Sequence, residues 1–393
     1  MWLIPIAVIV LFLLGIIEKK KHQENVNAIP IRININGIRG KSTVTRLVTG
    51  ILVEAGYKTV GKTTGTDARL IYWDTEKEKP IIRKPQGPNI NEQKDVVKEA
   101  ADRGAEALVS ECMAVNPDYQ ITFQDEWMQG NIGVIVNVLE DHMDVMGPTL
   151  DEVAEAFTAT IPHNGHLIIS DDNYVEYFTR KAEERNTKVI VADTSRISES
   201  FLREFDYMVF PENAALALAV AQALGIDEET AKRGMLNARP DPGALRIIPL
   251  FDQKEPSYFV NGFAANDARS TLNIWKRVTD LGYPAEDPIV IMNCREDRVD
   301  RTEQFAESVL PHIESGMLIL IGESTWPVVD AYQKGMIPSR RLLNLEGAKA
   351  EEIVEKLPKN MGSRVIYGVG NIHGAAEPFI EALKEYQLKE LVS

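Results

Sequence analysis

The segment from Asn36 to Thr43 has the spacing of a phosphate-binding loop. It reads Asn-Gly-Ile-Arg-Gly-Lys-Ser-Thr and lies between an expected strand and an amphipathic helix. A glycine turn and a helix N-terminus supply convergent backbone N–H groups, a lysine meets the β- and γ-phosphates, and a serine hydroxyl binds Mg²⁺. The strict P-loop pattern has glycine six positions before its lysine, where this chain has Ile35. We therefore predict a shortened loop, with a chance glycine turn as the alternative, that binds ATP through Gly37, Ile38, Arg39, Gly40, Lys41, Ser42 and Thr43.

Glu111 is the expected second ligand of a nucleotide-bound Mg²⁺. It follows the apolar run Ala107–Ser110. A carboxylate at the carboxyl end of a strand, beside a phosphate loop, is well placed for that ion. Alone, such a glutamate is more often a solvated strand end, but the loop upstream favours the metal ligand.

A histidine among carboxylates follows another expected strand. Residues 137–144 read Asn-Val-Leu-Glu-Asp-His-Met-Asp, so three carboxylates lie close in sequence to His142. Such a group can hold a metal ion or handle phosphoryl charge, although a lone histidine there is usually structural. We predict catalytic roles for Lys41, Glu111, His142 and Asp144, and metal contacts from Ser42, Glu111 and His142.

The elements that must position these residues alternate between strand-like and helix-like segments. This alternation is typical of α/β folds in which helices cover a parallel sheet. Thr149 and Glu152 predict a capping box at the start of a helix. Loop-forming residues gather at 237–243, between two α/β patterns. We predict an N-terminal anchor helix and tether at 1–27, a P-loop ATPase domain with a parallel sheet at 28–245, and a smaller Rossmann-like α/β domain at 246–393.

The first 17 residues carry no charge, and Glu18-Lys19-Lys20-Lys21-His22 follows directly. At 1.5 Å per residue such a helix is about 25 Å long, slightly less than a hydrocarbon core of about 30 Å. A cleaved signal peptide would carry its positive charge before the apolar run, and a buried core helix is the third possibility. We predict a single anchor in the cell membrane with the catalytic domains on the cytoplasmic side, where the lysines would stay.

Composition excludes some classes of protein. The net charge of −15 argues against nucleic-acid binding, which usually needs a basic face. Two cysteines, Cys112 and Cys294, lie too far apart in sequence to suggest a disulfide framework and fit a reducing compartment.

Taken together, these motifs resemble the Mur ligase family, over about residues 30–393. The resemblance implies a shortened phosphate loop at Gly37–Thr43, the Mg²⁺-binding glutamate at Glu111 and an N-x-x-x-D-H-x-D signature from Asn137 to Asp144. It also implies an adenine-side asparagine at Asn213, a nucleotide-contacting arginine at Arg246, and a ribose-contacting aspartate at Asp267.

Two departures from the family pattern affect the expected chemistry. Many members have a carbamylated lysine about fifteen residues after the histidine, but residues 157–160 here are Phe-Thr-Ala-Thr. A second metal site would therefore need other ligands. Only about 36 residues precede Gly37, which is too few for the UDP-binding domain of muramyl ligases.

Within the family, the chain resembles the ligases that form poly-γ-glutamate. This implies ATP and Mg²⁺ (or Mn²⁺) as cofactors, a γ-glutamyl acyl phosphate, and glutamate and the growing chain as substrates. Integral membrane subunits are the implied partners, because the polymer must leave the cell. Carboxylate substrates need cations, and the candidates are Arg269, Arg298 and Arg301, although the run 295–301 is also compatible with a self-paired surface loop.

Two other functions remain open. A membrane-tethered P-loop ATPase that acts as a switch or assembly factor would explain the phosphate loop and the apolar N-terminus. A ligase similar to folylpolyglutamate synthase would explain the motifs. The segment Gly368–Gly374 resembles a dinucleotide turn, but the chain ends before the acidic strand that a Rossmann fingerprint needs.

Overall fold

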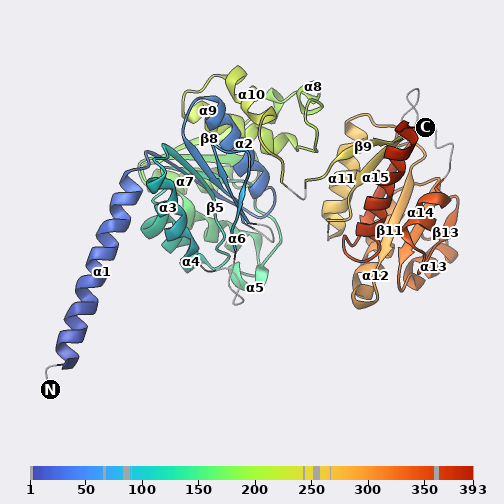
Figure 1. Ribbon diagram of the computed structural model, residues 1–393, viewed down its shortest axis with the longest axis horizontal. Helices are drawn as coiled ribbons and strands as arrows, with labels where there is room; N and C mark the ends of the chain where they lie inside the picture. Colours follow the sequence, from blue (N-terminus) through green and yellow to red (C-terminus); the bar gives the residue numbers. More distant parts are fainter. Residues whose placement is uncertain are drawn as a thin grey trace. The chain divides into compact units, whose positions relative to one another are not determined.

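The computed structural model describes residues 3–64, 68–82, 89, 91–241, 244–250, 257–265, 267–357 and 363–392. The chain divides into two compact units (Figure 1). Unit 1 comprises Met1–Phe205 and Val209–Pro242, and unit 2 comprises Asp206–Met208 and Gly243–Ser393. The division falls a few residues before the predicted domain boundary at 245/246.

Unit 1 is built on an eight-stranded sheet with the order β4-β3-β2-β5-β1-β6-β7-β8. All neighbours are parallel except β2–β3 and β3–β4. The central strands are almost wholly buried because helices cover both faces. The strands are β1 Ile31–Asn36, β2 Thr59–Lys62, β3 Arg69–Tyr72, β4 Lys79–Pro80, β5 Ala107–Glu111, β6 Ile132–Ile135, β7 His166–Ser170 and β8 Lys188–Ala192.

The helix that follows the predicted phosphate loop is the centre of one helical layer. Helix α2 buries its apolar stripe and packs against α9 and α10. The approach of α10 is close enough that a Cβ at Gly50 would clash with the Gly234 carbonyl. The predicted capping box is confirmed, with Thr149 and Glu152 bonding each other's backbone. The longer helices after α1 are α2 Lys41–Glu54, α3 Glu92–Asp102, α6 Leu150–Phe157, α7 Val175–Glu183, α9 Pro211–Ala223 and α10 Glu228–Leu236; α4 Pro117–Ile121, a π-helix Thr122–Met128, α5 Met143–Met146 and α8 Glu199–Leu202 are shorter.

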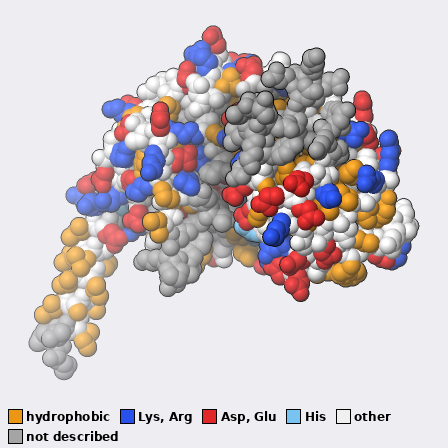
Figure 2. Space-filling view, turned by 45° about the vertical axis from the view of Figure 1, so that its right-hand side comes forward, with side chains coloured by type: hydrophobic (Ala, Val, Ile, Leu, Met, Phe, Trp, Pro, Cys, Tyr) orange, Lys and Arg blue, Asp and Glu red, His pale blue; other side chains and the backbone are white. Residues whose placement is uncertain are grey.

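Helix α1 (Leu3–Asn27) corrects the prediction of a membrane anchor. Its C-terminal part packs on unit 1, where Val26 is buried and His22 Nε2 lies 2.9 Å from the Trp127 carbonyl. Its N-terminal part carries exposed hydrophobic side chains along its length (Figure 2). Among the described residues, no helix has the length and apolar character needed to cross a membrane. The described apolar run ends at Ile17, after about 22 Å of helix, and the same helix continues with four charged residues.

Unit 2 contains a six-stranded sheet with the order β13-β12-β11-β14-β10-β9, in which only β9–β10 is antiparallel. Strands β11 and β14 are neighbours although β12 and β13 lie between them in sequence. Phe259, Phe263 and Phe379 form part of the core under α14 and α15. The elements are β9 Ile247–Leu250, β10 Ser257–Asn261, α11 Ala268–Asp280, β11 Ile289–Cys294, α12 Val299–Ser308, β12 Met317–Gly322, α13 Trp326–Gln333, β13 Leu342–Asn344, α14 Ala350–Lys356, β14 Val365–Gly370 and α15 Ala376–Val392. The predicted α/β fold with parallel sheets is confirmed.

Candidate nucleotide and metal site

The glycine loop, residues 37–40, connects β1 to α2 in a conformation that requires glycine at both ends. Gly37 has φ +128° and Gly40 has φ +86°. A Cβ at Gly37 would lie 3.0 Å from the backbone nitrogens of Val136 and Asn137, and one at Gly40 would lie 2.6 Å from Asn213 Oδ1. The loop is therefore packed against the end of β6 and against α9. The structure thus brings Asn213, predicted on the adenine side, next to the glycine loop.

Asn137 fixes the backbone of the glycine loop. Its Oδ1 accepts hydrogen bonds from the N–H groups of Ile38 (3.1 Å) and Arg39 (3.0 Å), and its Nδ2 donates to the Arg39 carbonyl (2.9 Å). One amide side chain therefore occupies two loop donors and one acceptor. Asn137 belongs to the N-x-x-x-D-H-x-D signature, but its role as the support of the loop depends on the adjacency of β1 and β6.

The Lys41 side chain folds back over the glycine loop. Its Nζ donates to the carbonyls of Gly37 (2.7 Å) and Ile38 (3.1 Å). Burial lowers the pKa of Lys41, and the Glu111 carboxylate partly opposes this effect. The ammonium is thus held at the N-terminus of α2, where helix dipole and backbone N–H groups also favour an anion.

Ser42 and Glu111 meet at the adjacent ends of α2 and β5. The Ser42 hydroxyl donates to Glu111 Oε2 at 2.9 Å, and the Thr64 backbone N–H donates to the same oxygen at 2.8 Å. Glu111 is only 3% exposed. A hydroxyl and a carboxylate oxygen are the hard ligands that Mg²⁺ prefers, and Mg²⁺ usually takes its other ligands from water and phosphate. These residues therefore fit a nucleotide-bound Mg²⁺.

The predicted histidine–carboxylate group is more open. His142 has φ +50°, its side chain is 52% exposed, and its backbone N–H donates to Asp141 Oδ1 at 2.9 Å. Asp141 also pairs with Arg39 at 3.3 Å. Asp144 is exposed in the first turn of α5. In the described parts of the chain, no group of three or more His, Cys, Asp or Glu side chains is arranged to hold a metal.

Thr43 lies in the first turn of α2, and the other remaining predicted residues lie in unit 2. Asp267 is the N-cap of α11 and accepts a hydrogen bond from the Ser270 N–H at 2.8 Å. Arg246 pairs with Asp206 at 3.8 Å, and Arg301 donates to Asn371 Oδ1 at 2.7 Å. The other two predicted substrate residues, Arg269 and Arg298, are exposed.

Sequence reasoning missed two contributors to this region. Thr64 acts through its backbone N–H, so its side chain gives no signal in the sequence. Arg46 is fully buried one helical turn after Ser42, and arginine in an amphipathic helix is normally expected on the solvated face. Its burial is explained by the carboxylates of Glu78 and Asp241, which lie beside it in the structure.

Comparison with known proteins places each part of the chain. Residues 35–222 match the family model "Mur ligase middle domain", and residues 247–386 match "Poly-gamma-glutamate synthase CapB C-terminal domain". The chain is 70% identical to PGA synthase CapB of Bacillus subtilis (strain 168) over 393 residues, covering 100% of both chains. It is 65% identical to the capsule biosynthesis protein CapB of Bacillus anthracis over 387 residues, covering 98% of this chain and 83% of that one.

The fold also resembles solved structures of much lower sequence identity. The folylpolyglutamate synthase of Thermotoga maritima superimposes with a TM-score of 0.62 at 13% identity, over 95% of this chain and 93% of that one. At this identity the likeness concerns the fold alone.

Proposed function

The chain belongs to the CapB family of poly-γ-glutamate synthases, and we propose that it uses ATP and Mg²⁺ to join glutamate units through γ-amide bonds. The observation that carries the proposal is the convergence of Lys41, Ser42 and Glu111 beside a loop with positive-φ glycines at the N-terminus of α2. The 70% identity to PGA synthase CapB over the full length of both chains supports the same reaction.

The chemical problem is that a carboxylate and an amine do not condense at neutral pH, because hydroxide is a poor leaving group. Transfer of the γ-phosphoryl group of ATP to a γ-carboxylate gives an acyl phosphate and ADP. The α-amine of an incoming glutamate then attacks the acyl carbon and releases phosphate, which forms the amide. Catalysis of phosphoryl transfer consists mainly of positioning and charge stabilisation.

The residues of the site divide this work. Lys41 and the backbone N–H groups of the first turn of α2 would bind the phosphate chain, with Asn137 keeping the glycine loop in shape through the N–H groups of Ile38 and Arg39. Ser42 and Glu111 would hold Mg²⁺, which neutralises charge on the transferring phosphoryl group. In this proposal His142 and Asp144 stabilise the charge of the metal ion or of the phosphoryl group. Both side chains are exposed, and His142 lies beside Asp141, which pairs with Arg39 of the glycine loop. Asn213, against Gly40, would contact the adenine side of the nucleotide.

Recognition of the organic acid requires cations. The exposed guanidinium groups of Arg269 and Arg298 fit carboxylates in bidentate geometry. Arg301 would act less directly, because one of its nitrogens is already bonded to Asn371. We assign Arg246 and Asp267 of unit 2 to the nucleotide only as part of this proposal.

Export implies protein partners. A polyanion such as poly-γ-glutamate cannot cross hydrocarbon unaided, so we propose integral membrane subunits as partners of the enzyme. The exposed apolar side chains of α1 offer a surface for a protein contact. Cross-linking from a cysteine introduced at Leu11, compared with one at exposed Lys98, tests whether a membrane protein lies at this helix.

The decisive experiment measures ADP release by the full chain with ATP and Mg²⁺, with and without glutamate, in membranes that contain its partners. A ligase releases ADP only when glutamate is present, and mass spectrometry should detect γ-linked oligomers. Equal ATP hydrolysis with and without glutamate would instead support a P-loop ATPase switch. Addition of glutamate to a folate substrate, instead of to a glutamate chain, would support a folylpolyglutamate-type ligase.

A further inference from the structure

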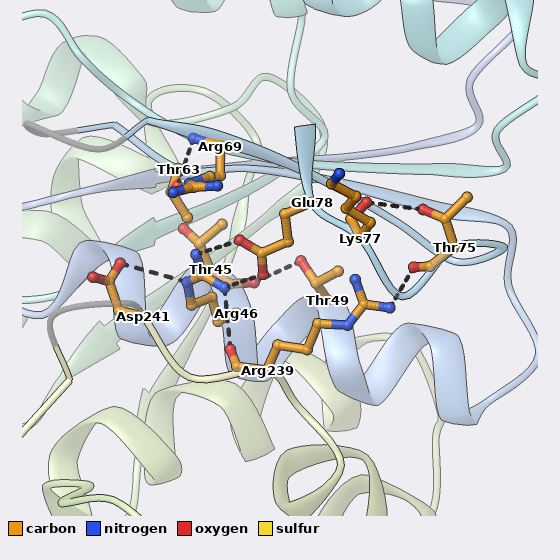
Figure 3. A network of polar contacts seen from close by, with 10 residues as sticks. All are labelled: Thr45, Arg46, Thr49, Thr63, Arg69, Thr75, Lys77, Glu78, Arg239 and Asp241. Atoms are coloured by element: carbon orange, nitrogen blue, oxygen red, sulfur yellow. Dashed lines mark hydrogen bonds and ion pairs between the residues drawn. The ribbon is translucent and has the colours of Figure 1, made fainter. Parts of the chain in front are cut away.

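A buried arginine connects the helix of the phosphate site to a surface loop. Arg46 lies in α2, one turn after Ser42, and its side chain is only 1% exposed. Its two terminal nitrogens donate to both carboxylate oxygens of Glu78, at 2.6 and 3.1 Å (Figure 3). Glu78 belongs to the loop that joins β3 to β4. This bidentate pair fixes the loop to α2.

The same guanidinium also contacts the beginning of the linker that leads to unit 2. Nη1 of Arg46 donates to the carbonyl of Arg239 at 3.2 Å, and Nε lies 3.5 Å from Asp241 Oδ2. Arg239 in turn donates to the carbonyl of Thr75 in the β3–β4 loop. Figure 3 shows these three segments meeting around Arg46. Unit 1 therefore holds the chain as far as Asp241.

The two acidic partners of Arg46 differ in burial. The Glu78 side chain is 13% exposed and takes both ends of the guanidinium fork, whereas the Asp241 side chain is 35% exposed and lies beside Nε. A buried guanidinium must keep at least one close carboxylate, because an unpaired buried charge is strongly destabilising. Glu78 satisfies this requirement, so the contact with Asp241 is not needed to neutralise Arg46 and serves to hold the chain at Asp241.

We propose that Arg46 and Asp241 are positioning residues that fix where the joint between the two units begins. This rests on the proposed ligase function. With Asp241 held, the chain has fewer accessible conformations directly before unit 1 ends. Because Arg46 lies in α2, the contact attaches the end of unit 1 to the same helix whose first turn carries Lys41 and Ser42.

The test removes the linker contact and leaves the buried pair in place. Asp241→Asn removes one negative charge and keeps the shape of the side chain. Asp74→Asn is the matched control, since Asp74 forms an exposed ion pair with Arg103 (2.9 Å) at the same β3–β4 loop. Asp241→Glu restores the charge. Each full-length variant is compared with the wild type by thermal unfolding, hydrogen exchange of the segment 236–246, ATP-analogue affinity and glutamate-dependent ADP release.

We expect Asp241→Asn to speed exchange in the segment 236–246 and to lower kcat about three- to fivefold, the size of one partly exposed ion pair. KM for ATP should stay at its wild-type value and the midpoint of unfolding should fall only slightly, and Asp241→Glu should recover kcat. Asp74→Asn should change neither exchange nor kcat. Unchanged exchange in Asp241→Asn would overturn the proposal, as would a parallel loss of ATP affinity. If Asp241→Asn exchanges faster in the segment 236–246 but ADP release by the wild type does not depend on glutamate, the ligase function is refuted. The contact between Arg46 and Asp241 would then still be supported.

Discussion

The two mainly parallel sheets are similar in architecture, but the carboxyl ends of their strands carry different side chains. In unit 1, β5 ends at Glu111, whose carboxylate faces a hydroxyl and a backbone N–H beside the Lys41 ammonium. In unit 2, β11 carries Asn293 near its end, and its Nδ2 donates to the carbonyls of Asn371 (2.6 Å) and His373 (2.8 Å) after β14. The first edge presents a glutamate and a lysine, and at the second edge the Asn293 amide holds the loop that follows β14.

Both edges contain glycines that allow the backbone to turn. Gly37 and Gly40 have positive φ in unit 1, and Gly370 and Gly374 have positive φ in unit 2. Neighbouring parallel strands with a crossover between them commonly form a binding crevice at their carboxyl ends. Positive-φ glycines therefore occur at both edges, and the two edges differ in the side chains at their strand ends. If the proposed function holds, those side chains distinguish the phosphate site from the other edge.

The largest effect expected from this contrast is the loss of Lys41. Replacing Lys41 with Met removes the ammonium from the phosphate site and should lower glutamate-dependent ADP release by roughly 10²–10³-fold. The measurement is steady-state ADP formation at saturating glutamate. Lys98→Met is the control, because Lys98 forms an exposed pair with Asp102 far from the loop. Near-normal turnover in Lys41→Met would show that the charged edge is not the reaction site.

Glu111→Gln tests the metal contact at the same edge. The amide keeps the shape of the carboxylate and can still accept from Ser42 and Thr64, but it is a poor ligand for Mg²⁺. The Mg²⁺ concentration for half-maximal activity should rise about tenfold or more. Glu106→Gln is the matched control, since Glu106 precedes the same strand and accepts from the Lys58 N–H at 3.0 Å. An identical Mg²⁺ response in the two variants would remove Glu111 from the metal site.

The hydrogen bonds of Asn293 at the edge of the unit 2 sheet should contribute to the free energy of unfolding. Asn293→Ala leaves the buried carbonyl of Asn371 and that of His373 without their donor, which should destabilise unit 2 by about 2–3 kcal/mol. Denaturant unfolding followed by tryptophan fluorescence measures this loss, with Trp275 and Trp326 reporting on unit 2. Exposed Asn273 is the control position for the same substitution. ATP-analogue affinity should remain unchanged in Asn293→Ala, and a tenfold loss would assign Asn293 to the nucleotide.

Much of the fold and the centre of the site could be predicted from the sequence. Apolar runs and turn residues indicated the alternating α/β pattern, and the spacing from Gly37 to Thr43 indicated the loop. The prediction of the N-terminal anchor was wrong, because apolar character alone did not reveal that α1 is a single helix whose charged second half packs on unit 1.

Other features could not be predicted because they depend on which strands become neighbours. The support of the glycine loop by Asn137 arises from β1 lying beside β6. The burial of Arg46 depends on Glu78 and Asp241, which are distant in sequence. The roles of His142 and Asp144 remain predictions, since their side chains are exposed.

The smallest expected effect concerns an ion pair away from both sheet edges. Burial acts to raise the pKa of Glu99, but hydrogen bonds from Lys79 and Tyr72 outweigh it and hold the pKa below its ordinary value. A carboxyl with a lowered folded pKa stabilises the protein above its unfolded pKa of 4.5, and this contribution is lost as pH falls through the folded value. The Lys79 side chain is 56% exposed, so the contribution should stay below about 1 kcal/mol. The free energy of unfolding of Glu99→Gln should therefore lie slightly below that of the wild type at pH 7 and converge with it towards pH 3. Exposed Glu76→Gln should follow the wild type throughout. A Glu99→Gln curve that runs parallel to the wild type would show that ionisation of Glu99 contributes nothing to folding.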